Sequence, residues 1–160
     1  ILQNLCKEIA APMANDFSNL TAKSATTNGE KLFVRYGIRG VRGEAIDGFP
    51  ILFDVAFPKM EQLLQENYNL NDTGILTLFT ILANSEDTNV ISRSSYKRMT
   101  EIQHTLKKEL ENDLEHRDFL HFAQKLDQEF IAQNISPGGS ADILALSYFL
   151  HFLKQDFNLY

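Results

Sequence analysis

The segment 75–83 constrains the fold more than any other part of this chain, because it is apolar at nearly every position. A helix that is hydrophobic on all sides has to be covered on all sides by neighbouring segments. The segment 96–114 can supply such a neighbour, since its apolar residues recur at three- and four-residue steps. The alternating pattern of strands is missing from the sequence. We therefore predict an all-α fold, a multi-helix bundle of about seven helices without a sheet, with residues 1–160 as a single all-helical domain.

Proline and capping residues mark where the helices should begin, end or bend. Further helices are expected over residues 2–20, 30–36, 49–64, 119–130 and 143–153. Pro12 should bend or divide the first of them, and Pro58 should kink the third, because proline lacks the N–H of a helical hydrogen bond. Asn71 or Asp72 is the expected N-cap of the helix that contains the apolar segment.

Charge and cysteine content narrow the function classes. The formal net charge is −6 and Cys6 is the single cysteine. At this charge a general nucleic-acid binder is not expected, although a local phosphate-binding patch is compatible with it. One cysteine excludes an intrachain disulfide framework and fits a reducing cytosol, so we expect a cytoplasmic protein. No apolar run is long enough to span a membrane. The first residue is Ile rather than Met, which suggests a fragment, a processed product or missing upstream residues.

The segment 36–44 combines glycine with arginine. Glycine falls at positions 37, 40 and 43, and arginine at 35, 39 and 42. So much glycine predicts a loop rather than a regular helix, and guanidinium groups on such a loop can hold phosphates through paired hydrogen bonds. Glu44 adds a carboxylate to the same segment. A solvated basic connector is the alternative interpretation.

Two adjacent acids, Glu86 and Asp87, follow the apolar helix, with Asn89 and Arg93 close behind. Carboxylate and amide oxygens suit Mg²⁺, which often shares its ligands with phosphate groups. An ordinary helix-terminal turn with solvated acids is the alternative. Negative charge at the C-terminal end of a helix is mildly unfavourable, which adds weight to a functional role.

The segment 136–142 opens the last and most apolar helix. Its sequence is Ser136-Pro137-Gly138-Gly139-Ser140-Ala141-Asp142. The glycines allow a ligand to approach the backbone closely, and the free N–H groups of a helix start favour an anion such as phosphate. The alternative is the capped start of a buried helix, with a serine as N-cap.

Taken together and in this order, the three polar segments resemble the triphosphoribosyl-dephospho-CoA synthase family. The resemblance spans about residues 28–153 and rests on Tyr36-Gly37, Arg42-Gly43-Glu44-Ala45, Gly48-Phe49, Glu86-Asp87-Thr88-Asn89 and Ser136-Pro137-Gly138-Gly139-Ser140-Ala141-Asp142-Ile143-Leu144-Ala145. Each motif is weak alone, and jointly they are specific. Members of the family are longer, with Gly-, His- and Asp-containing motifs in an N-terminal part that this sequence lacks. The chain therefore resembles the C-terminal portion of such an enzyme.

The resemblance implies an all-helical transferase whose substrates are ATP and 3'-dephospho-CoA. Such an enzyme joins the ATP ribose to a ribose hydroxyl of dephospho-CoA and releases adenine. Its product is the precursor of the prosthetic group of the citrate lyase acyl carrier protein, or of malonate decarboxylase. No nucleic-acid or membrane partner is expected. A homo-oligomer whose protomers share one site is compatible with the sequence.

The implied reaction needs a base, a hydrogen-bond donor for the departing adenine, and groups that control the triphosphate charge. Glu44 and Asp87 are the catalytic candidates, with Glu44 as base or second metal ligand. Mg²⁺ is assigned to Glu86 and Asp87. The expected phosphate- and ribose-binding residues are Arg39, Arg42, Asn89, Arg93, Ser136, Gly138, Gly139, Ser140 and Asp142.

Two other function classes remain open. The chain could be a non-catalytic helical interaction or nucleotide-binding module whose polar segments are packing turns. It could also be a Mg²⁺-dependent helical hydrolase of nucleotide or ADP-ribosyl substrates. The enzyme interpretation requires the three segments to converge on one cleft, whereas the module interpretation lets them scatter.

Overall fold

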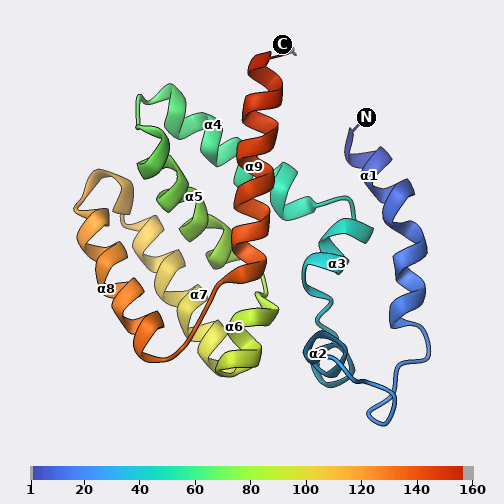
Figure 1. Ribbon diagram of the computed structural model, residues 1–160. Coiled ribbons are helices and arrows are strands. Elements are labelled where there is room, and N and C mark those ends of the chain that lie inside the picture. Colours follow the sequence, from blue (N-terminus) through green and yellow to red (C-terminus); the bar gives the residue numbers. More distant parts are fainter. Residues whose placement is uncertain (1, 157–160) are drawn as a thin grey trace.

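The computed structural model describes residues 2–156, and this part of the chain contains nine α-helices and no strand (Figure 1). The α-helices are α1 (Leu2–Ala10), α2 (Asn28–Tyr36), α3 (Gly40–Ile46), α4 (Phe57–Gln65), α5 (Leu70–Asn84), α6 (Thr88–Arg93), α7 (Tyr96–Glu111), α8 (Phe119–Ala132) and α9 (Gly138–Asp156). Two 3-10 segments, η1 (Ala11–Phe17) and η3 (Leu114–His116), and one π-helical segment, η2 (Ile51–Ala56), complete the frame. The predicted all-α class is confirmed.

Helix α5 lies at the centre of the molecule, with α4, α7 and α9 packed around it (Figure 1). Its Leu76, Ile81 and Leu82 are almost completely buried, which confirms that the apolar segment 75–83 belongs to the core. Burial of each such side chain contributes about 1.5–3 kcal/mol. Tertiary packing therefore stabilises these helices more than their intrinsic propensity does.

The N-cap of α5 is Asn69, whose side chain accepts the N–H of Asp72 at 3.0 Å. The prediction of Asn71 or Asp72 as N-cap is therefore wrong. The helix begins earlier than expected, at Leu70, so both residues lie inside its first turn.

Both interior prolines interrupt helical structure as predicted. Pro12 lies at the start of η1, where the α-helical geometry of α1 gives way to a 3-10 segment. Pro58 lies at the start of α4, directly after the π-helical segment η2. There the N–H of Phe57 donates to the carbonyl of Leu52, five residues earlier. Irregular helical hydrogen bonding of this kind is expected next to a residue that has no N–H.

The glycine-rich segment contains a short helix, α3, where a loop was predicted, and that prediction is wrong. Glycine disfavours a helix by about 1 kcal/mol per residue. However, α3 packs against α1, η1 and α9, and packing overrides weak propensity. At Gly43 the absence of a side chain is itself needed, because an added Cβ would lie 2.5 Å from the Cβ of Arg39.

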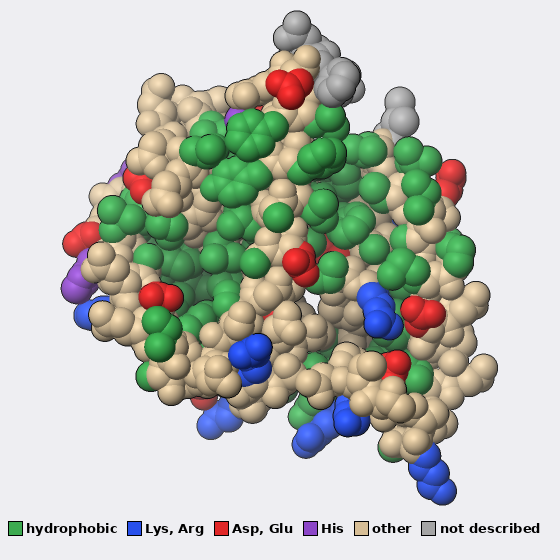
Figure 2. Space-filling view, in the orientation of Figure 1, with side chains coloured by type: hydrophobic (Ala, Val, Ile, Leu, Met, Phe, Trp, Pro, Cys, Tyr) green, Lys and Arg blue, Asp and Glu red, His purple; other side chains and the backbone are tan. Residues whose placement is uncertain are grey.

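One end of the molecule exposes apolar side chains. On α1, Leu2, Leu5 and Ile9 are 44%, 48% and 72% exposed, and Phe149 and Phe152 of α9 are exposed as well. Figure 2 shows hydrophobic side chains gathered on this face near the two described chain ends. The described part of the chain therefore leaves this face uncovered. Among residues 2–156, no helix is long and apolar enough to cross a membrane.

Candidate active site

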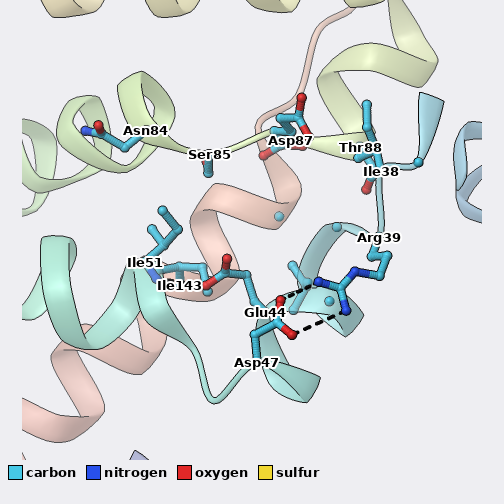
Figure 3. A pocket seen from close by; sticks show the side chains of 16 residues that line it. Ile38, Arg39, Glu44, Asp47, Ile51, Asn84, Ser85, Asp87, Thr88 and Ile143 are labelled. Atoms are coloured by element: carbon cyan, nitrogen blue, oxygen red, sulfur yellow. Dashed lines mark hydrogen bonds and ion pairs between the residues drawn. The ribbon is translucent and has the colours of Figure 1, made fainter. Parts of the chain in front are cut away.

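Three segments that are far apart in the sequence meet at one cavity of about 390 Å³. They are α3 with the turn that precedes it, the junction between α5 and α6, and the first turn of α9. Figure 3 shows Glu44 and Asp47 on one side of the cavity, and Asp87 and Thr88 on the other. The convergence that the enzyme interpretation requires is therefore present.

Asp87 ties two of these segments together from a buried position, with only 3% of its surface exposed. Its Oδ1 accepts the N–H groups of Asn89 (2.9 Å) and Val90 (3.2 Å) and so caps α6. Its Oδ2 accepts the N–H (2.7 Å) and the hydroxyl (2.8 Å) of Ser140 in α9. Because both oxygens are engaged, the geometry favours a structural role for Asp87. Its catalytic and metal-binding roles stay predictions.

The start of α9 packs closely against α6. A Cβ added at Gly138 would lie 2.2 Å from Nδ2 of Asn89, and one added at Gly139 would lie 3.4 Å from Oδ2 of Asp87. The two glycines thus allow helix backbone to reach the floor of the cleft. The N–H of Ser140 already donates to Asp87, so this predicted phosphate donor is engaged within the protein.

Glu44 is a half-buried carboxylate of the cavity. Its Oε2 accepts the N–H of Ile51 at 2.9 Å, which ties α3 to η2. Burial raises the pKa of the Glu44 carboxyl, and the nearby charge of Asp47 adds to the rise, while the hydrogen bond from Ile51 opposes it. A carboxylate with a raised pKa in a cleft has the property that general bases need.

Two of the predicted arginines line the site. Arg39 forms a two-pronged ion pair with Asp47, in which Nη1 lies 3.3 Å from Oδ1. Arg42 forms an exposed ion pair with Asp16 at 3.6 Å. Both arginines line an adjoining cavity of about 280 Å³. Exposed pairs of this kind are worth about 1 kcal/mol or less, so an anionic ligand can compete for the guanidinium groups.

The adjoining cavity also brings in predicted residues from the other two segments. Asn89 of α6 and Gly139 and Asp142 of α9 line it. Arg93, Ser136, Gly138 and Ser140 line neither this cavity nor the one of about 390 Å³. Arg93 donates to the side chain of Asn134 at 3.4 Å, and Ser136 is exposed. The structure therefore gathers most of the predicted set at the two cavities and leaves these four residues outside their lining.

Glu86 is the carboxylate that best fits a Mg²⁺ ligand. Among residues 2–156, no group of three or more His, Cys, Asp and Glu side chains is arranged to hold a metal ion. Mg²⁺ bound with a triphosphate needs only one or two carboxylates, because phosphate oxygens and water supply the rest. Glu86 lines the cavity and is exposed, and its Oε1 accepts the hydroxyl of Tyr96 at 3.2 Å. Asp87 fits a metal less well, since both of its oxygens are engaged.

Four polar residues of the cavity were not predicted from the sequence as site residues: Asp47, Asn84, Ser85 and Thr88. Asp47 follows Glu44 by three residues, a spacing that indicates a shared face only once the segment is known to be helical. The hydroxyl oxygen of Ser85 is buried and has no hydrogen-bond partner within the described residues. No pattern in the sequence marks Ser85.

We expect Gly40→Ala to destabilise the protein by about 1–3 kcal/mol more than Gly37→Ala. Both glycines have positive φ, +57° and +74°, so alanine at either position costs about 1–2 kcal/mol. Only at Gly40 would the added Cβ also lie 2.8 Å from Cγ2 of Thr88. Urea denaturation of both variants measures the difference. Equal losses would mean that Thr88 moves aside without cost.

The fold and the site define an all-helical protein whose cleft is built from helix ends and lined by carboxylates and an arginine. The sequence matches the model of the ATP:dephospho-CoA triphosphoribosyl transferase family over residues 2–159, and the chain belongs to this family.

Curated relatives carry a matching name. The chain is 37% identical over 154 residues to the 2-(5''-triphosphoribosyl)-3'-dephosphocoenzyme-A synthase of Escherichia fergusonii, covering 95% of this chain and 50% of the relative. It is 33% identical over 141 residues to the probable synthase of the same name from Streptococcus mutans, covering 88% and 48%. The chain thus spans about half the length of these relatives. No solved structure was found to match it.

Proposed function

We propose that this chain carries an active site that transfers the triphosphoribosyl group of ATP to a ribose hydroxyl of 3'-dephospho-CoA and releases adenine. The observation that carries the proposal is the meeting of three distant polar segments at one cavity. A packing module would not need them to meet. The family's description names the two substrates and the group transferred, and the relatives' names give the product.

The chemistry is a glycosyl-type substitution at the anomeric carbon of the ATP ribose. The hydroxyl oxygen of dephospho-CoA forms the new bond to that carbon while the bond to adenine breaks, and the departing adenine takes up a proton. The transition state should carry oxocarbenium character, by analogy with glycoside hydrolysis. Glu44 is the proposed base that accepts the hydroxyl proton, because it is half-buried and its pKa is raised.

The phosphates of ATP are assigned to Arg42 and to the backbone at Gly138 and Gly139. Arg42 lines the adjoining cavity, where its guanidinium group could exchange an exposed carboxylate for phosphate oxygens. A helix start that lacks side chains lets the ligand approach its N–H groups. Ser85 lines the cavity, and its buried hydroxyl has no partner among the described residues; after rotation toward the cavity it is the proposed donor to a ribose or adenine group.

Mg²⁺ is the proposed cofactor, held by Glu86 together with the triphosphate. When bound, it would neutralise phosphate charge and so ease the approach of the nucleotide to a cleft that already holds several carboxylates. Arg39 and Asn89 are proposed to orient the phosphates and the ribose. Arg93 and Ser136 have less support, because neither lines the cavities.

We further propose that the complete enzyme combines this domain with a second region. That region would be equivalent to the half of the relatives that the chain does not match. The exposed apolar face of α1 and α9 supports this proposal. The product would serve the acyl carrier protein of citrate lyase, or malonate decarboxylase, in the cytoplasm. Two protomers sharing one site is the alternative way to complete the cleft.

Calorimetric titration with ATP, with and without Mg²⁺, tests the proposal, and an assay for adenine release follows in the presence of 3'-dephospho-CoA. Saturable, Mg²⁺-dependent ATP binding is expected. Adenine release should require 3'-dephospho-CoA, and release without it would indicate a hydrolase instead. If neither the chain nor its combination with the unmatched half of the Escherichia fergusonii relative binds ATP, the proposed function is wrong.

A further inference from the structure

A third cleft, of about 390 Å³, lies between α2 and the junction of α6 and α7. Lys31, Arg35, Tyr36 and Tyr96 line it, and we call it the Lys31–Arg35 cleft. None of the residues predicted from the sequence as binding or catalytic lines it, so the function proposed above leaves it unused.

The Lys31–Arg35 cleft adjoins the cavity that contains Glu44 and Glu86 through two direct links. Tyr36 lines the cleft, and the next residue, Gly37, lines the cavity. Glu86 lines the cavity, and its carboxylate accepts the hydroxyl of Tyr96, which lines the cleft. The linings of the two spaces are therefore in direct contact at Tyr36–Gly37 and at Tyr96–Glu86.

The two spaces have opposite electrostatic character. The cavity that contains Glu44 and Glu86 is lined by four carboxylates and one arginine. The Lys31–Arg35 cleft is lined by two cations and no carboxylate, although the whole chain has a net charge of −6. Within residues 2–156, neither Lys31 nor Arg35 forms an ion pair. A phosphate chain would be repelled by the carboxylates and attracted to this cleft.

Contacts within the protein hold the guanidinium group of Arg35 and the two tyrosine rings of the cleft in place. Lys31 and Arg35 are four residues apart on α2 and so project from the same face of the helix. The rings of Tyr36 and Tyr96 stack with their centroids 5.2 Å apart, and the guanidinium carbon of Arg35 lies 5.0 Å from the centroid of Tyr36. A guanidinium group held in this way loses less freedom when it binds a phosphate.

We propose that the Lys31–Arg35 cleft binds the diphosphate of 3'-dephospho-CoA. The ribose of the same molecule would extend past Tyr36 and Gly37 into the cavity, where its hydroxyl meets Glu44. This inference rests on the proposed function. ATP also carries a phosphate chain, but its phosphates are assigned to Arg42 and the start of α9, so dephospho-CoA is the substrate that still needs a cationic site.

The test is the double variant Lys31→Gln/Arg35→Gln, titrated separately with 3'-dephospho-CoA and with ATP plus Mg²⁺. Affinity for 3'-dephospho-CoA should fall at least about tenfold, while affinity for ATP stays within about twofold. Added salt should weaken the wild-type binding of 3'-dephospho-CoA more than that of the double variant. The matched control is Lys107→Gln/Lys108→Gln, which changes net charge equally at exposed positions of α7 that line none of the three cavities.

Each other outcome overturns the inference. If the double variant behaves like the control, or loses ATP affinity as much as dephospho-CoA affinity, the cleft is not the diphosphate site, and the proposed function stands. If the wild-type chain binds ATP but not 3'-dephospho-CoA, the inference fails as well, because every residue of the cleft lies in this chain. If neither the wild-type chain nor its combination with the unmatched half of a relative binds ATP, the proposed function is wrong, and the inference that rests on it is wrong as well. Far-UV circular dichroism checks that the variants are folded, and the single variants repeat the test with less perturbation.

Discussion

Asp87→Ala should lower the free energy of unfolding by about 3–5 kcal/mol. The buried carboxylate accepts four hydrogen bonds, two from the backbone of α6 and two from Ser140 of α9. Its removal leaves four donors without an acceptor, and each buried, unpaired donor costs about 1–3 kcal/mol before local relaxation. The loss should also loosen the contact between α6 and α9, which together form one side of the cleft. Urea denaturation followed by circular dichroism measures the change.

Asp118→Ala is the matched control. Asp118 caps α8 by accepting the N–H of His121 at 3.1 Å, but its side chain is exposed. Its loss should cost only about 0.5–2 kcal/mol, the usual value of an N-cap. Equal losses at the two positions would mean that the contacts of Asp87 with Ser140 add nothing to stability.

Asp87→Asn separates the structural role from the predicted metal role. Near-normal turnover with an unchanged Mg²⁺ requirement would rule out Asp87 as a metal ligand. If the same variant also has a lower free energy of unfolding, the structural role of Asp87 as a hydrogen-bond acceptor is supported.

Glu44→Gln should reduce turnover by about 10²–10⁴-fold, the usual contribution of a general base. Glutamine keeps the size of the side chain and can still accept the N–H of Ile51, but it cannot take up the hydroxyl proton. Adenine release from ATP in the presence of 3'-dephospho-CoA measures turnover, with the unmatched half of a relative added if the chain alone is inactive.

Asp47→Asn is the control for Glu44→Gln. Asp47 lines the same cavity, and its substitution by asparagine removes the same negative charge. Unlike Glu44, however, Asp47 forms an ion pair with Arg39. Turnover should fall by less than about tenfold. A loss as large as that of Glu44→Gln would show that the cavity needs negative charge in general rather than a base at position 44.

The pH dependence of the wild type follows from the raised pKa of Glu44. A base must be deprotonated, so turnover should fall on the acidic side at a higher pH than an ordinary carboxyl would give. In Glu44→Gln this acidic limb should disappear from the residual activity. An acidic limb that persists unchanged in the variant would belong to another group.

The same raised pKa has the opposite consequence for stability. Burial disfavours the charged form of Glu44, so its contribution to stability is present below the unfolded-state pKa and is lost as the pH rises through the folded-state pKa. At neutral pH Glu44→Gln should therefore be at least as stable as the wild type. A clear destabilisation would indicate that the charged carboxylate itself holds α3 in place.

Most of the helical frame was predictable because its signals are local. The apolar segment 75–83 needs cover on every side, and the spacing of apolar residues in 96–114 and 119–130 indicates the helices that supply part of it. Pro12 and Pro58 remove backbone donors wherever they occur, so the interruptions they cause can be read directly from the sequence. The motifs of the three polar segments likewise identified most residues that line the cavities.

The short helices were not predictable, because their stability comes from contacts. Helix α3 contains two glycines and forms because α1, η1 and α9 pack against it. Helix α6 has six residues and depends on Asp87 for its cap. An isolated helix of this length is unstable in water, so no local sequence pattern predicts it.

The all-α class, the central helix and the residue types available for phosphate chemistry can be read from the chain, since each depends on residues that are close in sequence. How those residues are used depends on contacts between distant segments. The contact between Asp87 and Ser140 spans 53 residues and supplies two of the four hydrogen bonds that the buried carboxylate of Asp87 accepts. Likewise, the pairing of Tyr36 with Tyr96 separates a basic cleft from an acidic cavity. Such roles depend on which distant donors and charges meet in space, and residue spacing along the chain carries no information about that.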